Sequence, residues 1–394
     1  MRALLLTNHL FEWAGSETLI HEISEELISR GENVTVFCND IDRKFRKKFQ
    51  CPGLTVVSNP DEIRVEDFDL IYCQHQVLIR FLDQMLEMDG AGGPIMVFAH
   101  LSPYEPLEFP GAGIELAFAD LILGNSAETR AKLIELGVPE PRLSIYPNPA
   151  PRAFFEIPPR SGSFRRLLAV SNHFPKEALA AFELLERSGV EVTRVGREFV
   201  NRRIHPADIA EHDAVFSIGK SIQYALAARR PAFVYDRFGG PGWLTPSNVE
   251  RASEFNFSGR CCNRNLVPDA LLKEVSGGFD AAVRALPELE PTRLGYRLPD
   301  HLDRIVSLAR LLRADLPRRC DVGASRSELA AFDREFHQHQ SLIAYRGSAR
   351  RYRAHLEVIG SSPYLRLQLW LWSRMGRRKL RRIRSRLFRA VVAK

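Results

Sequence analysis

Apolar residues in the first part of the chain form short continuous runs that alternate with helical patterns. Arg2–Thr7 is such a run, and apolar positions over residues 19–28 then recur at a helical spacing until Gly31. A second run follows at Asn33–Cys38. Continuously apolar runs are typical of strands that are buried on both faces of a parallel sheet. The order strand, glycine-containing loop, helix and strand therefore predicts a βαβ unit.

The same alternation continues along the chain with one interruption. Further strands are predicted at Leu54–Val57, Leu70–Cys73, Ile95–Ala99 and Leu121–Leu123, and then at Arg166–Ser171, Glu191–Val195, Ala214–Ser217 and Ala232–Tyr235. Helices are predicted at Leu78–Glu87, Ala127–Leu136, Lys176–Arg187 and Ser221–Ala228. The interruption, over residues 147–162, is rich in proline and is typical of a linker.

These patterns predict an α/β protein with two Rossmann-like, doubly wound domains that face each other across a cleft. We expect the first domain to span residues 1–157 and the second to span residues 158–318. After about residue 265 the patterns are helical, at 266–283, 302–312, 326–338 and 345–358. We therefore expect a helical extension over residues 319–394. Ligands of such sheets bind at the carboxyl ends of the strands, so the cleft is the expected site.

Composition narrows the class of protein. The 394 residues are 45% hydrophobic and 26% charged, which excludes a collagen-like, wholly disordered or polytopic membrane protein. The six cysteines form no CxxC pair and no zinc-spaced Cys/His cluster, and we expect reduced, buried thiols. The apolar run at residues 3–6 is too short for a signal peptide, and no apolar stretch reaches eighteen residues. We therefore expect a cytoplasmic location.

The basic charge of the chain is concentrated in its last segment. Residues 363–394 hold eleven basic residues and no acidic one, so the net charge of +7 leaves the rest of the chain at −4. Apolar residues recur there at spacings of three and four, and Trp370 and Trp372 lie among them. This pattern predicts a cationic amphipathic helix on an anionic membrane surface. Nucleic-acid binding by this tail and a helix packed on the body are the alternatives, and we expect no nucleic-acid partner.

Gly15 and Ser16 lie between the first predicted strand and its helix. A glycine at that place lets the backbone approach a ligand closely, and the first N–H groups of the helix favour an anion. The alternative is a tight turn in which Ser16 or Glu17 caps the helix.

Several segments, in order, resemble the retaining, nucleotide-sugar-using glycosyltransferases of the GT-B fold. The opening segment, residues 4–37, resembles their first loop, helix and second strand, and Phe98-Ala99-His100 resembles their strand-end histidine. The run from Ile122 to Pro139 stands where that family has a strand, a helix and a Gly-Val-Pro segment. Its Pro-Asn-Gly segment corresponds to Tyr146-Pro147-Asn148-Pro149. The resemblance covers roughly residues 1–260. It implies that Lys176, which follows the first strand of the second domain, contacts the donor diphosphate.

The sequence departs from that family at its acidic pair. The two positions are Phe216 and Tyr224 here, and Asn172 replaces an arginine. Three segments instead resemble a subgroup of bacterial envelope-polysaccharide transferases: Gly219-Lys220-Ser221, residues 235–242 and residues 255–260. Gly219, Lys220 and Ser221 open a helix and would bring N–H groups, a cation and a hydroxyl to a pyrophosphate. The alternative for Lys220 is a solvated lysine at a helix start.

Other candidate donor contacts follow from the same segments. Gln223 would bond the base or the ribose in place of a glutamate. Gly239, Gly240 and Gly242 form a predicted turn at a strand end that would face the sugar or phosphate, or is a structural turn. Arg260 is a second phosphate clamp or an ordinary loop arginine.

The candidate acid–base groups are His100 and Glu105, at a predicted strand end of the first domain. A structural histidine is the alternative for His100. Retaining transfer needs no protein nucleophile if the leaving diphosphate takes the acceptor's proton. The chain has no clear Asp-x-Asp metal motif, so we expect transfer without a metal and no cofactor apart from the nucleotide-sugar substrate.

The resemblance and the tail together predict a membrane-peripheral glycosyltransferase. It would move a sugar from a nucleotide-diphosphate sugar to a lipid-linked or growing envelope glycan at the cytoplasmic face of the membrane. The missing acidic pair leaves open a non-catalytic, nucleotide-binding or scaffolding relative in an assembly complex. An isomerase of the same fold that acts on nucleotide sugars is the third alternative.

Overall fold

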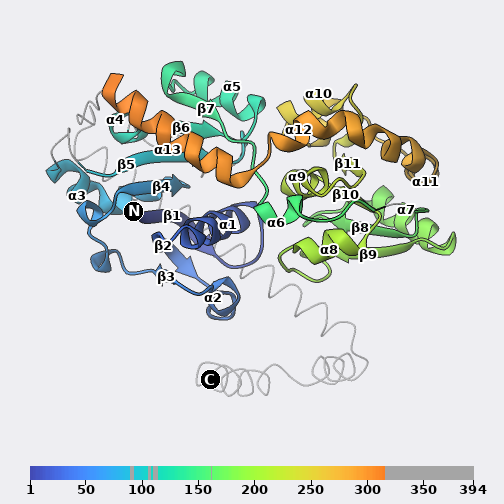
Figure 1. Ribbon diagram of the computed structural model, residues 1–394, viewed down its shortest axis with the longest axis horizontal. Helices are drawn as coiled ribbons and strands as arrows, with labels where there is room; N and C mark the ends of the chain where they lie inside the picture. Colours follow the sequence, from blue (N-terminus) through green and yellow to red (C-terminus); the bar gives the residue numbers. More distant parts are fainter. Residues whose placement is uncertain (89–92, 105–107, 110–113, 161, 316–394) are drawn as a thin grey trace, which may run out of the picture. The chain divides into compact units, whose positions relative to one another are not determined.

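The computed structural model describes residues 1–88, 93–104, 108–109, 114–160 and 162–315. Two sheets with helices on both faces lie within one compact unit, Met1–Ala324 (Figure 1). The helices predicted at 326–338 and 345–358 and the basic tail at 363–394 lie outside the described residues. This arrangement confirms the predicted α/β architecture with two Rossmann-like domains.

The first domain is built on a seven-stranded parallel sheet with the order β3-β2-β1-β4-β5-β6-β7. The burial of β1 on both faces explains the continuous apolar run that opens the sequence. Its strands are β1 (Arg2–Leu10), β2 (Asn33–Ile41), β3 (Leu54–Val57), β4 (Leu70–Gln74), β5 (Ile95–His100), β6 (Leu121–Gly124) and β7 (Leu143–Ile145). Its helices are α1 (Gly15–Ser29), α2 (Arg43–Phe49), α3 (Leu82–Glu87), α4 (Ile114–Phe118) and α5 (Ala127–Glu135).

The second domain is built on a five-stranded sheet with the order β12-β11-β10-β8-β9, in which only β12 runs antiparallel. Its strands are β8 (Arg166–Val170), β9 (Glu191–Val195), β10 (Ala214–Ser217), β11 (Ala232–Asp236) and β12 (Gly239–Trp243). Its helices are α7 (Lys176–Arg187), α8 (Pro206–Glu211), α9 (Lys220–Ala227), α10 (Val249–Glu254), α11 (Pro268–Ala285) and α12 (Glu290–Leu294). The short α6 (Arg152–Phe155) lies in the proline-rich linker.

The last described helix, α13 (Leu298–Asp315), returns to the first domain. It lies along the first sheet, in orange in Figure 1, and its residues Leu298, Leu302, Ile305 and Ala309 join the core formed with β1, β2 and α1. The expected boundary, which assigned residues 158–318 to the second domain, is therefore wrong for α13. The apolar face of this helix gives no sign of which of the two sheets it covers, because both cores are apolar.

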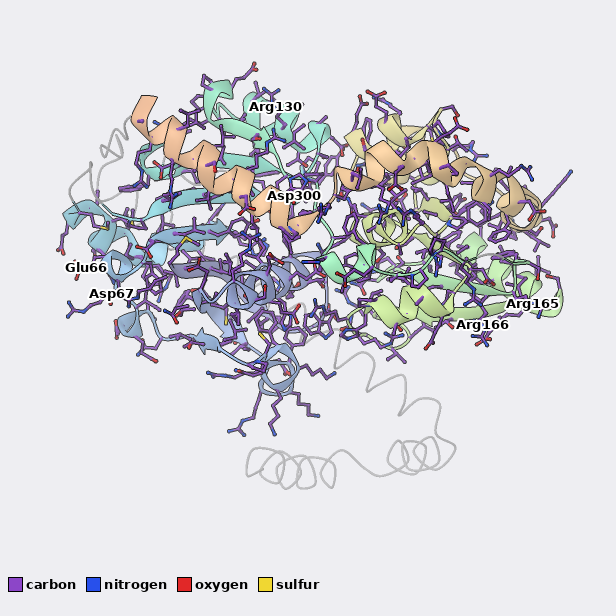
Figure 2. All side chains as sticks on the ribbon, viewed as in Figure 1. Glu66, Asp67, Arg130, Arg165, Arg166 and Asp300 are labelled. Atoms are coloured by element: carbon purple, nitrogen blue, oxygen red, sulfur yellow. The ribbon has the colours of Figure 1, made fainter. Side chains whose placement is uncertain are left out.

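Exposed ion pairs cover the outer surface of both domains. Arg130 pairs with Glu140 at 2.9 Å, and Arg166 pairs with Glu191 at 3.4 Å (Figure 2). Such exposed pairs contribute only about 0–1 kcal/mol each. The buried pairs that join the two domains are of a different kind, and they lie at the cavity described next.

Candidate functional site

A cavity of about 590 Å³ lies between the two domains, at the carboxyl ends of strands from both sheets. The first domain contributes the loop after β1 and the ends of β5 and β6. The second contributes the ends of β8, β9, β10 and β11. Its lining includes glycines at two helix starts together with polar and charged side chains: Gly15, Ser16, Glu108, Asn148, Arg202, Arg203, Gly219, Lys220, Ser221, Arg237, Asn256 and Arg260. The cleft expected from the strand order is thus present as a cavity.

Two helices begin at this cavity, one from each domain. Gly15 and Ser16 open α1, and Gly219, Lys220 and Ser221 lie at the start of α9. Gly219 has a φ of +54°, a left-handed conformation that glycine adopts most readily. The N–H groups in the first turn of a helix have no intrahelical acceptors and favour an anion. The structure therefore brings together these five residues predicted from two distant loops.

Lys220 is a buried, paired lysine rather than a free cation. Its Nζ lies 2.7 Å from a carboxylate oxygen of Glu22 on α1 and donates a hydrogen bond to the carbonyl oxygen of Pro149 at 2.8 Å. The hydroxyl of Tyr224 donates a hydrogen bond to the same carboxylate. Burial lowers the pKa of Lys220, although Glu22 opposes this effect. The interpretation of Lys220 as a solvated lysine is wrong, since its side chain is only 9% exposed.

Most of the other cations on the cavity wall also have carboxylate partners. Arg203 pairs with Glu25 of α1 at 2.5 Å, and Arg202 makes two 2.6 Å hydrogen bonds to Asp208. Arg260 pairs with Glu128 of α5 at 2.7 Å, so it connects the domains. Hydrogen bonds from His21 and Arg203 outweigh burial and lower the pKa of Glu25 to about 2.

Arg237 differs from these cations. It follows β11, is exposed, and lies over the ring of Phe238 with its guanidinium carbon 4.7 Å from the ring centroid. Among the arginines and lysines described at this cavity, Arg237 is the one without a carboxylate partner. Sequence reasoning missed it, because it stands at the variable position of the segment Tyr235–Gly242.

Several residues predicted to contact the donor lie away from the cavity wall. Lys176 is exposed at the first position of α7 and does not line the cavity. Gln223 is buried inside α9, with 1% of its surface exposed, and it donates a hydrogen bond to the Oδ1 of Asn256 at 3.2 Å. The amide of Gln223 therefore acts on the cavity only through Asn256.

The three glycines Gly239, Gly240 and Gly242 belong to strand β12 and are not a ligand-facing turn. All three are buried and none lines the cavity. A Cβ atom at Gly239 would lie 1.9 Å from the carbonyl oxygen of Arg264, and one at Gly240 would lie 2.0 Å from that of Val234. The expected turn is wrong because these glycines permit close backbone packing at a sheet edge.

His100 is the last residue of β5, and both of its ring nitrogens are engaged. Its Nδ1 lies 2.5 Å from the carbonyl oxygen of Glu108, and its Nε2 lies 3.0 Å from a carboxylate oxygen of Glu115. Burial lowers the pKa of His100, but the Glu115 carboxylate outweighs burial and raises it. His100 does not line the cavity, and these contacts favour its structural interpretation. Glu105 lies outside the described residues.

A further buried cluster, formed by His9, Glu17, His75 and Glu108, lies beside the cavity in the first domain. His75 Nε2 lies 3.2 Å from Glu108 Oε1, and His9 Nε2 lies 3.6 Å from Glu17 Oε1. Burial lowers the pKa of His9 to about 4 and raises the pKa of Glu17 to about 7. Only Glu108 of these four lines the cavity. These four ionisable groups of the first domain are thus paired with one another.

The described residues contain no group of three or more His, Cys, Asp or Glu side chains arranged to hold a metal ion. No helix in the described part of the chain is long and apolar enough to span a membrane.

No protein-family model and no curated protein sequence matches the chain. Among solved structures, that of Anabaena Alr3699/HepE in complex with UDP and glucose aligns at a TM-score of 0.50 with 13% identity, over 80% of this chain and 99% of that one. A second structure of Alr3699/HepE, with UDP-glucose, aligns at 0.45 with 13% identity over 74% and 100%. The lipopolysaccharide outer core galactosyltransferase WaaB, in its apo form, aligns at 0.37 with 12% identity over 73% and 98%.

The chain therefore has the fold of the GT-B glycosyltransferases, as its sequence predicts. Two Rossmann-like domains face each other across a cleft, and the cavity lies in that cleft.

Proposed function

We propose that the protein is a glycosyltransferase that takes a sugar from a nucleotide-diphosphate sugar bound in the interdomain cavity. One observation supports this proposal most directly: in a GT-B fold, α1 begins at Gly15 and α9 begins at Gly219–Ser221, and both helix starts line the same cavity. A diphosphate between them would accept hydrogen bonds from both helices. The unpaired guanidinium of Arg237 adds a positive charge to the same wall.

These groups suit the chemistry of a leaving diphosphate. In a retaining transfer the bond from the anomeric carbon to the diphosphate oxygen breaks, and the acceptor oxygen bonds to the same face of that carbon. The acceptor's proton passes to the leaving diphosphate, and no protein nucleophile takes part. Helix N–H groups and Arg237 would stabilise the charge that develops on the diphosphate. We propose that this transfer needs no metal ion.

Binding and turnover test this proposal. We expect UDP and UDP-glucose, chosen because the similar Alr3699/HepE was solved with them, to raise the melting temperature and to bind by calorimetry. We also expect label from UDP-glucose, or from another nucleotide sugar, to enter glycan or lipid extracts of the source membranes. A protein that binds none of the UDP-, GDP- and dTDP-linked hexoses or their nucleotides contradicts the proposal.

We further propose that the acceptor is a lipid-linked or growing envelope glycan, met at the cytoplasmic face of a membrane. Residues 363–394 support this, since they combine eleven basic residues with an apolar stripe. Each basic residue near an anionic surface contributes about 1 kcal/mol, so removing five should weaken vesicle binding by roughly 10³–10⁴-fold.

The membrane test uses the full chain and vesicles of phosphatidylglycerol and phosphatidylcholine. The variant has glutamine in place of five tail residues, Arg377, Arg378, Arg381, Arg382 and Arg384. The matched control has glutamine in place of five exposed residues of the body, Arg165, Arg166, Arg284, Arg304 and Arg310. We expect the tail variant to stay in the supernatant and the control to sediment with the vesicles. Equal sedimentation of both contradicts a membrane role for the tail.

A non-catalytic, nucleotide-binding role is the second candidate. It is favoured by the full engagement of His100 with Glu108 and Glu115, and by the absence of the family's acidic pair at Phe216 and Tyr224. In that case nucleotide sugars bind by calorimetry but are not turned over with membrane extracts as acceptor.

A further inference from the structure

Three amide side chains form a connected cluster at the base of the cavity. The Nδ2 of Asn148 donates a hydrogen bond to the Oδ1 of Asn256 at 3.3 Å, and the Nε2 of Gln223 donates to the same oxygen at 3.2 Å. Asn148 and Asn256 line the cavity, while Gln223 lies behind them in α9. The cluster therefore fixes two cavity-lining amides through a third, buried one.

The backbone at both asparagines is held in a conformation that few residues adopt. Asn148 and Asn256 each have a φ of +50°, in the left-handed region that asparagine tolerates better than most side chains. Asn148 comes just after the last strand of the first domain, and Asn256 belongs to the second domain. The cluster therefore spans the two domains at the cavity.

The cluster is not saturated by its own hydrogen bonds. Within the described part of the chain, Asn148 Oδ1 and Gln223 Oε1 are buried and have no hydrogen-bond partner. Asn148 is 7% exposed and Gln223 is 1% exposed. Exchanging the oxygen and nitrogen of all three amides still leaves Asn148, which lines the cavity, with one polar atom that has no partner in the described part of the chain. A hydroxyl group matches that atom in either orientation, because a hydroxyl both donates and accepts.

We propose that Asn148, held by Asn256 and Gln223, binds a hydroxyl group of the transferred sugar; this rests on the proposed glycosyltransferase function. The cluster adjoins the place proposed for the diphosphate, since a Cβ atom on Gly219 would lie 3.5 Å from Asn256 Nδ2. The transferred sugar carries several hydroxyl groups. It has to lie between the two domains, because it must meet the acceptor there. A cluster shared by both domains therefore fits the sugar better than it fits the ribose.

The test compares each nucleotide sugar with its parent nucleotide. Affinities of the full-length protein for UDP-glucose, UDP-galactose, UDP-N-acetylglucosamine and GDP-mannose, and for UDP and GDP, are measured by calorimetry. The variant Asn148→Gly removes the amide and suits the left-handed backbone. The control Asn263→Gly changes the same residue type at the same φ of +50°, at an exposed position that does not line the cavity.

We expect Asn148→Gly to lower the affinity for the preferred nucleotide sugar about tenfold and to leave the affinity for its free nucleotide unchanged. Asn263→Gly should change neither. If Asn148→Gly does not fold, Asn256→Gly suits the same left-handed backbone and removes the amide that holds Asn148. That variant should likewise lose its preference for the sugar over the free nucleotide.

Three other results overturn the inference. Equal weakening of nucleotide and nucleotide sugar means that the cluster supports the ribose, the diphosphate or the hinge. If Asn148→Gly leaves the affinity for both unchanged, Asn148 does not contact the donor. If the wild-type protein binds no nucleotide sugar more tightly than its free nucleotide, it has no such subsite. A wild-type protein that binds no nucleotide at all contradicts the proposed function itself, which separates that failure from the other three.

Discussion

The two walls of the cavity use polar side chains in opposite ways. Behind the first-domain wall, His75 pairs with Glu108 inside the domain. The carboxylates Glu22, Glu25 and Glu128 of the same domain pair with cations of the second domain. On the second-domain side, Asn256, the first N–H groups of α9 and the unpaired Arg237 line the cavity. The carboxylates of the first domain are thus used by contacts within the protein, while the second wall keeps an unpaired cation for a ligand.

The two walls are joined by buried charges. Glu22, fully buried on α1, contacts Lys220 and Tyr224 of α9 and lies 3.6 Å from Arg203. Lys220 and Tyr224 therefore serve the contact between the domains. Of the cations described on the second wall, Arg237 is the one without a carboxylate partner. The largest expected effect of a mutation is on this contact.

Glu22→Gln should destabilise the protein by about 3–5 kcal/mol, because it leaves the buried Lys220 without its counter-charge. Urea denaturation followed by tryptophan fluorescence measures this. The control is Glu191→Gln, which breaks the exposed pair with Arg166 and should change the free energy of unfolding by less than about 1 kcal/mol. The double variant Glu22→Gln/Lys220→Met should be less destabilised than the sum of the single variants. Additive effects would show that the two side chains are not coupled.

Glu17→Gln tests a buried carboxyl group behind the first wall. Burial raises the pKa of Glu17 from its ordinary value of 4.5 to about 7, so the folded protein holds this proton more tightly than the unfolded chain. Its contribution to stability is complete below pH 4.5 and is lost as the pH rises through about 7. The variant, which stays neutral, should be more stable than wild type by up to about 3 kcal/mol at pH 8 and equal to it at pH 4. A difference that does not change between these pH values contradicts the assignment.

Much of the fold could be predicted from the sequence, because buried parallel strands are continuous apolar runs. Strand β9 and helix α7 were expected with the bounds that the structure shows, Glu191–Val195 and Lys176–Arg187. Strand β12 was missed, because Gly239-Gly240-Pro241-Gly242 has the composition of a turn. Local propensity is overridden there by the close approach of the backbones of β11 and of Arg264.

The site could be predicted only as far as local structure determines it. The two helix starts follow from a strand, a glycine and a helical pattern, and the structure places both at the cavity. The pairing of Lys220 with Glu22 depends on how the two domains meet, and no local pattern contains that information. Asn148 and Asn256 stood in motifs that were noticed, but their left-handed backbone and their contact with each other appear only in three dimensions.

Arg237→Ala tests the ligand-facing wall, and its expected effect is the smallest of the three. A charge-assisted hydrogen bond to a diphosphate contributes about 1.5–3 kcal/mol, so the affinity for UDP or GDP should fall at least about tenfold by calorimetry. Arg165→Ala, at the outer edge of the second domain (Figure 2), removes the same side chain far from the cavity and should have no effect. The fall should shrink in high salt, because Arg237 is exposed and its attraction for the anion is screened. Equal affinities of Arg237→Ala and wild type would mean that the helix N–H groups hold the anion without this cation. Both walls would then hold the anion in the same way, through the N–H groups at a helix start.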